Sequence, residues 1–358
     1  MSIRVRKGAP MRRYGIGYDT GFINLGMSTR ESFDPEVVWR EMSVIRHDLH
    51  CDTVRVTGGD PERLEVAATH AADLGLKVWF SPFTCDLTTG ELLDLLADCA
   101  ERAERLRKRG AEVVFVTGAE LSLFTKGFLP GDVCTDRIET LLTAPDAQRR
   151  ELLAALPERI NDFLGRAVDV VRRRFGGKVT YASIPFERVD WTPFDLVSVD
   201  LYRTIEIADR FREGVRALVA EGKPVAITEF GCTAYRGAAD KGAHGGDIVE
   251  WDGTTPVRLD GDYVRDESEQ AACLRELLEI FEAEGVDTAL VCTFASYHLP
   301  HRSGPRRDLD LASYGVVKVF DDRLGRTYPD LPWEPKLAFT ALAEHYAART
   351  AGHVPNAR

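Results

Sequence analysis

The chain has 358 residues, of which 44% are hydrophobic and 29% are charged, and its formal net charge is −11. A phosphate backbone or an anionic membrane surface repels an acidic chain outside any local basic patch, so we expect neither a nucleic acid nor a membrane as a partner. The basic N-terminus, MSIRVRKGAPMRRYGIGYD, lacks the apolar stretch of a secretory signal, and no run of about eighteen apolar residues could span a bilayer. We therefore predict a cytoplasmic protein, and the sequence predicts no particular oligomeric state.

The cysteines are odd in number and scattered, and none forms a Cys-x-x-Cys pair. This pattern favours buried thiols in a reducing compartment over a disulfide scaffold or a zinc site, and no cofactor is expected. The seven are Cys51, Cys85, Cys99, Cys134, Cys232, Cys273 and Cys292.

Short apolar runs alternate with helical patterns along most of the chain. Strands buried on both faces read as continuous apolar runs, as in parallel sheets. Eight strands, nearly all followed by a helix, predict an α/β protein with a single (β/α)8 TIM-barrel domain over 1–358, with flexible tails at 1–12 and 350–358. The rival is a doubly wound open sheet, but no Gly-rich phosphate turn follows the first strand. We expect strands at 14–19, 52–58, 77–83, 112–120, 178–184, 195–202, 223–229 and 287–295, and helices near 35–49, 61–74, 89–110, 157–175, 205–221, 266–284 and 334–348.

Three connections are much longer than the rest. The segments after strand 4 (121–156), strand 7 (230–265) and strand 8 (296–333) are each about 35 residues, against the usual two to six. All three leave the face of the barrel at which barrel enzymes build their active sites. The lengths therefore predict a cleft shaped by long loops on that face.

Two glutamates end predicted strands: Glu120 in VVFVTGAEL, on the fourth, and Glu229 in PVAITEFG, on the seventh. Each alone is explained by a salt bridge at the rim or by a cap on the next loop. Together they are the pair that glycoside hydrolysis needs, in which one carboxylic acid protonates the leaving oxygen and the other carboxylate attacks the anomeric carbon.

These motifs resemble those of clan A, a large clan of retaining (β/α)8 glycoside hydrolases that includes cellulases, β-mannanases and β-galactosidases. In that clan the acid/base Glu follows strand 4 and the nucleophile follows strand 7. The match of ITEFG and GAEL implies that Glu229 is the nucleophile and Glu120 the acid/base. The resemblance further implies that Arg55, in VRVTG, keeps the nucleophile ionised and that Tyr202, in VDLYR, hydrogen-bonds it.

The chain departs from the clan at several positions. Ala119 stands where the clan usually has an Asn that binds the sugar 2-hydroxyl, a change that looks closer to the β-mannanase-like branches. Strand 8 usually supplies a Trp platform, and here CTFASYHLPH offers Phe294 and Tyr297. Strand 3, which often offers a His, reads FSPF. The substrate contacts are therefore predicted to differ from those of the clan.

The whole chain also resembles a set of actinobacterial proteins that share its ITEFGC, RGAAD, LPH and DLDLASYGVVKV segments. These relatives are often labelled abortive-infection proteins. The label names no reaction, so it implies a setting in defence and nothing about the chemistry.

Further polar side chains are candidates for substrate binding. Asp19 ends the first strand and Asp200 lies near the end of the sixth, so either could bind a sugar hydroxyl, while Asp200 could equally be a partner of another site residue. The loop at 297–315 concentrates charged residues. It is either a subsite wall that recognises an acidic group of the ligand or a loop held by its own Arg–Asp pairs. Two histidines lie there without a third ligand at a suitable spacing, so no metal is predicted. The charged and histidine residues of this loop are His298, His301, Arg302, Arg306, Arg307, Asp308 and Asp310.

Two functions of different classes follow. The first is a retaining β-glycoside hydrolase that acts on a small-molecule or oligosaccharide substrate through Glu120 and Glu229. The second is a glycosidase-like barrel with a non-hydrolytic role, either a defence or binding module or a biosynthetic enzyme that uses the same carboxylates for acid–base chemistry.

Overall fold

The structure is a computed structural model that describes residues 11–304 and 306–351. The predicted tails at 1–12 and 350–358 lie largely outside these residues. Where the two overlap, Met11 is buried and the last helix continues to Ala351.

Eight strands form one sheet in the order β7-β6-β5-β4-β1-β12-β9-β8. The register is parallel, as in the Val78–Val113 and Val114–Lys178 pairs. The two ends of this order are joined by a parallel bridge between Ser183 and Val199, so the sheet closes. The (β/α)8 barrel is thereby confirmed and the open-sheet rival excluded. The barrel strands are β1 (Arg13–Asp19), β4 (Thr53–Gly58), β5 (Lys77–Pro82), β6 (Val113–Ala119), β7 (Lys178–Ala182), β8 (Val197–Asp200), β9 (Val225–Glu229) and β12 (Thr288–Val291).

The barrel strands other than β1 are buried almost throughout. Every residue of β6 is buried, and β9 is buried except for its final residue, Glu229. Burial on both faces is the reason that these segments read as continuous apolar runs. Charged residues of the barrel strands stand at the first or last position of a strand, except Arg55, which lies inside β4.

The chain divides into two compact units. We call residues 19–42 and 54–201 the central unit, and residues 11–18, 43–53 and 202–351 the C-terminal unit. The strands β4 to β8 belong to the central unit almost entirely, and β1, β9 and β12 to the C-terminal unit.

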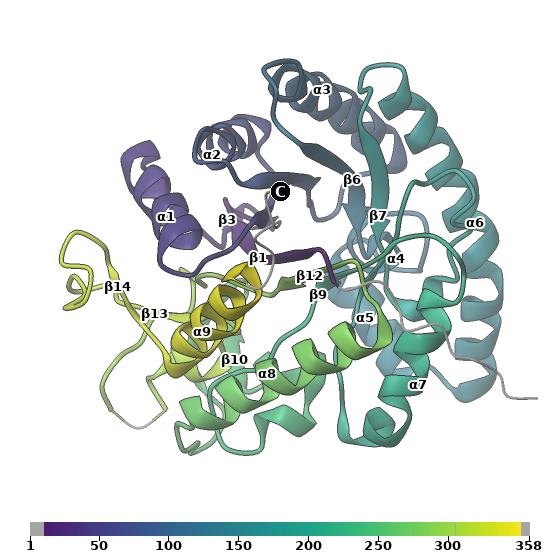
Figure 1. The fold of residues 1–358 in the computed structure, drawn as a ribbon. Coiled ribbons are helices and arrows are strands. Elements are labelled where there is room, and N and C mark those ends of the chain that lie inside the picture. The colour runs from purple at the N-terminus through teal and green to yellow at the C-terminus, as the bar shows by residue number, and fades with distance from the viewer. Residues whose placement is uncertain (1–10, 305, 352–358) are drawn as a thin grey trace, which may run out of the picture. The chain divides into compact units, whose positions relative to one another are not determined.

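The helices of the central unit begin at clear sequence signals. Asp60 caps α2 by accepting hydrogen bonds from two backbone N–H groups, and Thr88 and Glu91 form a capping box at the start of α3. The long helices α3 and α6 pack side by side (Figure 1). The helices of this unit are α2 (Pro61–Asp73), α3 (Thr89–Lys108), α4 (Leu121–Phe124), α5 (Cys134–Thr143) and α6 (Asp146–Arg172), and α1 (Pro35–His47) is divided between the two units.

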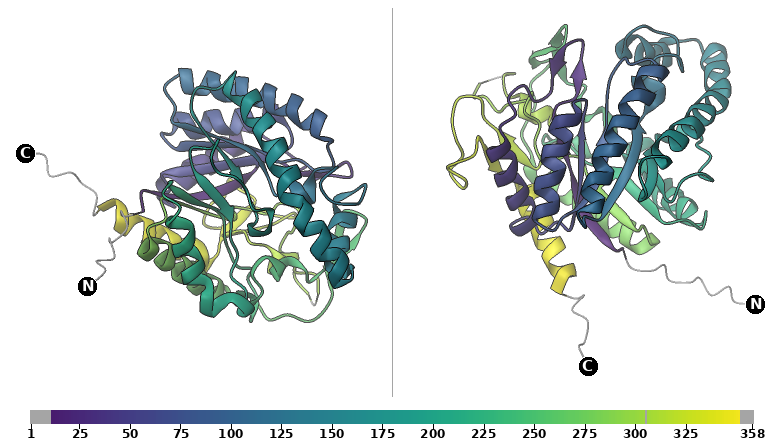
Figure 2. Two further views of the ribbon diagram at one scale, coloured as in Figure 1. Left: turned by 90° about the vertical axis from the view of Figure 1, so that its right-hand side faces the viewer. Right: turned by 90° about the horizontal axis from the view of Figure 1, so that it is seen from above.

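In the C-terminal unit the helices α8 and α9 lie side by side (Figures 1 and 2). Asp266 caps α8, and Gly285 ends it in a left-handed conformation. The helices of this unit are α7 (Ala208–Val219), α8 (Glu267–Glu284) and α9 (Leu337–Ala351). No helix in the described part of the chain is long and apolar enough to cross a membrane.

The three long connections contain more regular structure than the sequence predicts. The first holds α4, α5 and the start of α6, which begins at Asp146 and runs through Pro157 instead of starting there. The second holds a hairpin of β10 (Val249–Asp252) and β11 (Thr255–Leu259). The third holds β13 (Val317–Val319), which pairs with β14 (Trp333–Pro335), so the final helix starts after that strand. A hairpin β2–β3 (Ile23–Asn24, Met27–Ser28) follows β1.

Candidate active site

The predicted site residues are divided between the two units. The central unit holds Asp19, Arg55, Glu120 and Asp200, and the C-terminal unit holds Tyr202, Glu229, Phe294, Tyr297, His298 and Arg302.

Glu120 lies directly after β6, on a backbone that leaves the strand sharply. The ladder between β6 and β7 is irregular between Val116 and Ala119, and Gly118 there has φ +119°. A Cβ at Gly118 would lie 2.9 Å from the Leu121 side chain, so this position favours glycine. Glu120 itself is left-handed, with φ 45° and ψ 44°. Such a conformation costs a non-glycine residue about 1–3 kcal/mol and persists only where the surroundings hold it.

Glu187 holds the residues that follow Glu120. Its side chain is fully buried, and one carboxylate oxygen accepts hydrogen bonds from the Ser122 N–H at 3.0 Å and the Ser122 hydroxyl at 2.7 Å. The other oxygen accepts from the Tyr181 hydroxyl at 2.8 Å and the Ser183 hydroxyl at 3.1 Å. The Tyr181 hydroxyl in turn accepts from the Leu121 N–H at 2.8 Å. The first turn of α4 is therefore fixed from beneath by one buried carboxyl group.

Burial also changes the ionisation of this cluster. It raises the pKa of Glu187, while the hydrogen bonds from Ser122, Tyr181 and Ser183 act in the opposite direction. Burial and the nearby charge of Glu187 raise the pKa of Tyr181 well above its usual value, so the tyrosine stays a hydroxyl donor. The sequence analysis missed Glu187 because it lies in a short loop after β7 and ends no strand.

Arg55 and Asp200 form a buried ion pair. The Arg55 Nη1 and Asp200 Oδ1 atoms are 3.5 Å apart, and the two side chains are 1% and 0% exposed. The Arg55 Nε donates to the Ser81 hydroxyl at 3.2 Å. Removing one charge of such a pair leaves the other buried without compensation. The contact favours the view of Asp200 as a partner of another site residue over the view of it as a sugar ligand.

Asp19 organises the loop that follows β1. One carboxylate oxygen accepts from the Gly21 N–H at 2.8 Å, and the other accepts from the Thr29 hydroxyl. The Thr29 hydroxyl also accepts from the Phe22 N–H at 2.8 Å. Both Asp19 oxygens therefore brace the β2–β3 hairpin, whatever further contact one of them makes with a ligand.

Glu229 is the last residue of β9 and is half-buried. The Tyr202 hydroxyl donates to its Oε2 at 3.2 Å, which is the contact that the clan resemblance implied for this tyrosine. Burial raises the pKa of Tyr202 well above its usual value, and Cys292 and Glu229 add to the effect. Tyr202 is therefore a neutral hydroxyl that donates to the carboxylate.

Tyr314 supports this half of the site and was not found from the sequence. Its ring contacts that of Tyr202 edge to face, with 5.6 Å between the centroids. Its hydroxyl donates to the Gly242 carbonyl at 2.6 Å and accepts from the Gly245 N–H at 3.0 Å. Tyr314 thereby fixes the long segment that follows β9.

The aromatic residues predicted as a sugar platform lie in different settings. Phe294 is 0% exposed, and its ring packs against Tyr18 and, at 90°, against Trp333. A ring with no exposed face cannot stack on a sugar in this structure, because apolar packing occupies both of its sides. Tyr297 and His298 are half-buried, and the His298 ring stacks on Trp251 in β10 with 6.4 Å between the centroids.

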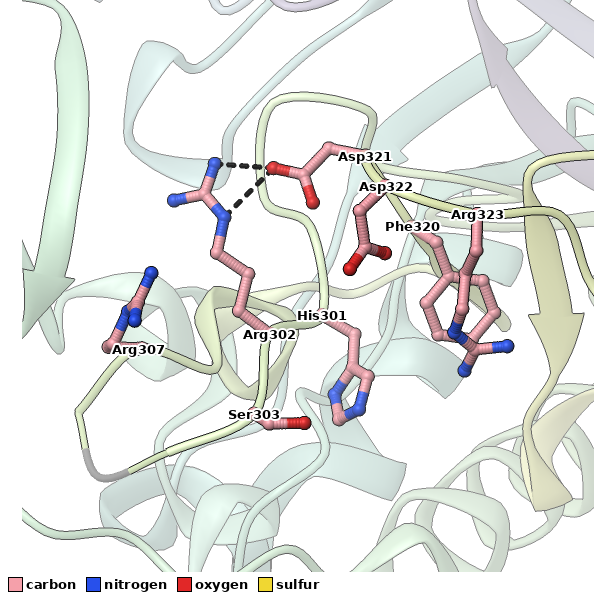
Figure 3. Close-up of a pocket in the computed structure, with 8 residues that line it drawn as sticks. All are labelled: His301, Arg302, Ser303, Arg307, Phe320, Asp321, Asp322 and Arg323. Atoms are coloured by element: carbon pink, nitrogen blue, oxygen red, sulfur yellow. Dashed lines mark hydrogen bonds and ion pairs between the residues drawn. The ribbon is translucent and has the colours of Figure 1, made fainter.

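Arg302 lies at a pocket of about 520 Å³ in the C-terminal unit (Figure 3). Its guanidinium points toward Asp321 and bonds it at 2.8 and 2.6 Å, while the Arg323 side chain lies over the ring of Phe320. The pocket is lined by His301, Arg302, Ser303, Arg307, Phe320, Asp321, Asp322 and Arg323.

The arginine and aspartate residues of the 297–315 loop that form ion pairs do so with residues outside the loop, although His301 bonds Asp308 within it at 2.8 Å. Asp308 and Asp310 both bond Arg265, and Arg306 bonds Glu250. The expectation that this loop is held by its own Arg–Asp pairs is therefore wrong, because these arginine and aspartate residues find their partners in other segments. Charge spacing in the sequence could not identify partners that approach from β10 and from the start of α8.

No family model and no curated protein matches the chain. The solved structures that resemble this chain in fold include the following two. One is a GH113 β-1,4-mannanase, with 17% identity over 95% of this chain and 100% of that chain and a TM-score of 0.58. The other is a β-glucosidase, with 13% identity over 96% of this chain and 99% of that chain and a TM-score of 0.55. At these identities the likeness shows the fold, a glycosidase-like barrel, and nothing in the comparisons supports the abortive-infection label.

Proposed function

We propose that the protein is a retaining β-glycoside hydrolase, with Glu229 as the nucleophile and Glu120 as the acid/base. The observation that carries the proposal is the position of the two glutamates, at the ends of the fourth (β6) and seventh (β9) strands of a (β/α)8 barrel. Active sites of such barrels form at the carboxyl ends of the strands, where residues from several strands meet.

The reaction takes two displacements. In the first, the Glu229 carboxylate bonds to the anomeric carbon as the bond to the leaving oxygen breaks, and Glu120 gives its proton to that oxygen. In the second, Glu120 takes a proton from water, whose oxygen displaces Glu229. The configuration at the anomeric carbon is then retained, and both carboxyl groups return to their starting states.

Other residues have supporting roles in this proposal. The Tyr202 hydroxyl, bonded to Glu229 Oε2, orients the nucleophile and is free to release it as the covalent bond forms. Arg55, whose guanidinium is held by Ser81 and Asp200, has the supporting role that the clan resemblance implies for the arginine of the second strand. Arg302 contributes to a subsite away from the reacting bond.

For the substrate we propose a β-linked mannoside or glucoside oligosaccharide. Ala119 has no amide to bind a sugar 2-hydroxyl, so this chain does not use the Asn contact that many clan members use. Mannosides carry an axial 2-hydroxyl and are the natural first choice for such a site. The fold likeness to a β-1,4-mannanase and a β-glucosidase sets the order in which to test substrates.

The experiment is trapping with activated 2-deoxy-2-fluoro β-mannosides and β-glucosides, followed by mass spectrometry of the peptides. The fluorine slows both steps, and a good leaving group restores the first, so the glycosyl-enzyme accumulates. We expect one sugar per chain, attached to the peptide that contains Glu229.

The matched control is the Glu229→Gln variant, which keeps the size of the side chain and removes its nucleophilic charge. It should fold as the wild type does and gain no label. A label on another residue, or hydrolysis of a β-mannan or β-glucan oligosaccharide with inversion by NMR, would overturn the assignment. A chain that neither labels nor hydrolyses any member of the panel would favour the non-hydrolytic alternative.

A further inference from the structure

Two thiols and a carboxylate of the central unit gather in one place, away from the strand-end glutamates. Cys85 and Asp86 follow β5, and Cys134 is the first residue of α5. One ligand atom from each of the three lies within 4.8 Å of the others. The Cys85 sulfur is also 3.6 Å from the side-chain oxygen of Asn24. Residues far apart in the sequence thus present soft and hard ligand atoms to a single point.

The Asp86 carboxylate is held by the surrounding backbone, yet one of its oxygens lacks a partner. Its backbone is left-handed, with φ 62°, and its N–H donates to the Phe124 carbonyl at 2.7 Å. Oδ1 pairs with Arg137, whereas Oδ2 is buried and accepts no hydrogen bond. A buried carboxylate oxygen without a donor is costly, and a cation would satisfy it.

Arg137 fits this cluster as a fixed counter-charge. Its side chain is 0% exposed, and it donates to the carbonyls of Leu123 at 2.6 Å and Gly131 at 3.0 Å. Two thiolates and one carboxylate carry three negative charges, which a divalent cation and Arg137 together neutralise.

The spacing of the three ligand atoms suits such a ligand set. Zinc–sulfur bonds of about 2.3 Å in a tetrahedral site place two sulfurs about 3.8 Å apart, within the spacing of this cluster.

We propose that Cys85, Asp86 and Cys134 bind one thiophilic divalent cation of the zinc class, with Asn24 or a water molecule as the fourth ligand. The site is structural. It joins the segment after β5 to α5, and Arg137 links the same cluster to the Leu123 carbonyl in α4, the helix that begins directly after Glu120. The proposal does not depend on the glycosidase assignment.

The experiment measures metal content and affinity in the full-length chain, purified under reducing conditions, stripped with a chelator and titrated with Zn²⁺ against a chromophoric competitor. Cd²⁺ serves as a second probe, because thiolate coordination gives it a near-ultraviolet charge-transfer band. We expect one Zn²⁺ per chain, and we expect Cys134→Ser and Cys85→Ser to lose Zn²⁺ binding. In Asp86→Asn the affinity for Zn²⁺ should fall by about tenfold or more.

The matched control is Cys273→Ser. Cys232 and Cys273 also form a contacting thiol pair, but no carboxylate completes a three-ligand group with them among the described residues. This variant should bind Zn²⁺ as the wild type does. Circular dichroism checks that each variant folds, and if the serine variants do not fold, Asp86→Asn and the melting temperature of the wild type with and without the chelator decide the question.

Three results would overturn the proposal. The first is wild-type affinity no greater than that of Cys134→Ser. The second is unchanged binding in Asp86→Asn together with a melting temperature that the chelator does not lower. The third is a Cys85–Cys134 disulfide in the peptide map with no bound metal, which would identify a redox pair instead.

Discussion

Glu120 and Glu229 each follow a buried parallel strand, but the chain holds them in different ways. Glu120 stands on a left-handed backbone after an irregular strand end, and the fully buried Glu187 fixes the residues beyond it. Glu229 is the last residue of a regular strand, and one tyrosine hydroxyl bonds its carboxylate.

The difference matters for what a substitution should do. Glu120 is supported through buried hydrogen bonds to the backbone that follows it. Loss of those hydrogen bonds should lower the stability of the fold as well as the activity. Support for Glu229 comes through a side chain that touches the carboxylate itself, so its loss should lower activity and leave the fold nearly unchanged. Each prediction below tests one side of this contrast.

The largest effects should come from the glutamates themselves, and the two should differ in kind. Glu229→Ala should abolish turnover of every β-glycoside, because no covalent intermediate can form. Glu120→Ala should lose about 10²–10⁴-fold on substrates with poor leaving groups and much less on dinitrophenyl glycosides, which need no acid. Steady-state rates over a series of leaving groups measure the difference.

Azide provides the control for this pair. It should rescue Glu120→Ala with a β-glycosyl azide as the product, and Glu229→Ala with an α-glycosyl azide. If the two variants gave the azide products in the opposite configurations, Glu120 would be the nucleophile and Glu229 the acid/base. If both variants lost the same rate on every leaving group, the two glutamates would not have distinct roles.

Tyr202→Phe should have the next largest effect on activity. It removes one hydroxyl that donates to a charged oxygen, a bond worth about 1.5–3 kcal/mol, which corresponds to a loss of about 10–100-fold in kcat/KM. The melting temperature should change little, because the phenyl ring keeps its packing on Tyr314. A Tyr202→Phe variant that unfolds more easily than the wild type but keeps its activity would contradict this prediction, because Tyr202 would then support the fold and not Glu229.

Glu187→Gln should act mainly on stability. One amide oxygen can keep the bonds from Ser122, but the amide nitrogen cannot accept those from Tyr181 and Ser183, so we expect a loss of about 1–3 kcal/mol in the free energy of unfolding.

The effect should also depend on pH. Because burial raises the pKa of Glu187 in the folded state, the group stabilises the fold fully below its unfolded pKa of about 4.3 and loses that contribution as the pH rises through the folded value. The difference between wild type and variant should therefore shrink from about pH 4 upward, as urea unfolding over a pH series would reveal. A difference that grows with pH would show that Glu187 is ionised in the fold.

The smallest effect should come from Arg302→Ala. The Arg302–Asp321 pair is 38% and 41% exposed, and such pairs contribute about 0–1 kcal/mol. We expect an unchanged melting temperature and kcat, with a rise in KM only for substrates long enough to reach this subsite. A loss of kcat on a short substrate would mean that the loop after β12 acts at the reacting bond, and that Tyr202 is not the main support of Glu229.

The sequence predicted the barrel and the positions of its strands to within about two residues, except that the eighth strand ends at Val291 and not at residue 295. It could do so because a strand buried on both faces and a helix buried on one face leave patterns among near neighbours. The same locality placed Glu120 and Glu229, since a carboxylate at the end of an apolar run is visible without knowledge of the fold.

Other features depended on contacts between distant segments. Local sequence said nothing of Glu187 beneath Ser122, 65 residues away, or of Arg265 as the partner of Asp308, 43 residues away. The clan resemblance suggested Phe294 as part of a sugar platform, but its ring is buried against Tyr18 and Trp333. Cysteines that were expected to be simple buried thiols include two that meet at Asp86.

The sequence by itself thus determined the alternation of strands and helices and the two strand-end glutamates that we propose for catalysis. Only the tertiary structure decided what surrounds them: which carboxyl group is buried, which hydroxyl reaches Glu229, and which side chains share a possible cation. The physical reason is the distance along the chain over which each feature is determined. Periodicity and strand ends are properties of a few consecutive residues, whereas hydrogen bonds, ion pairs and burial are set by the segments that folding brings together.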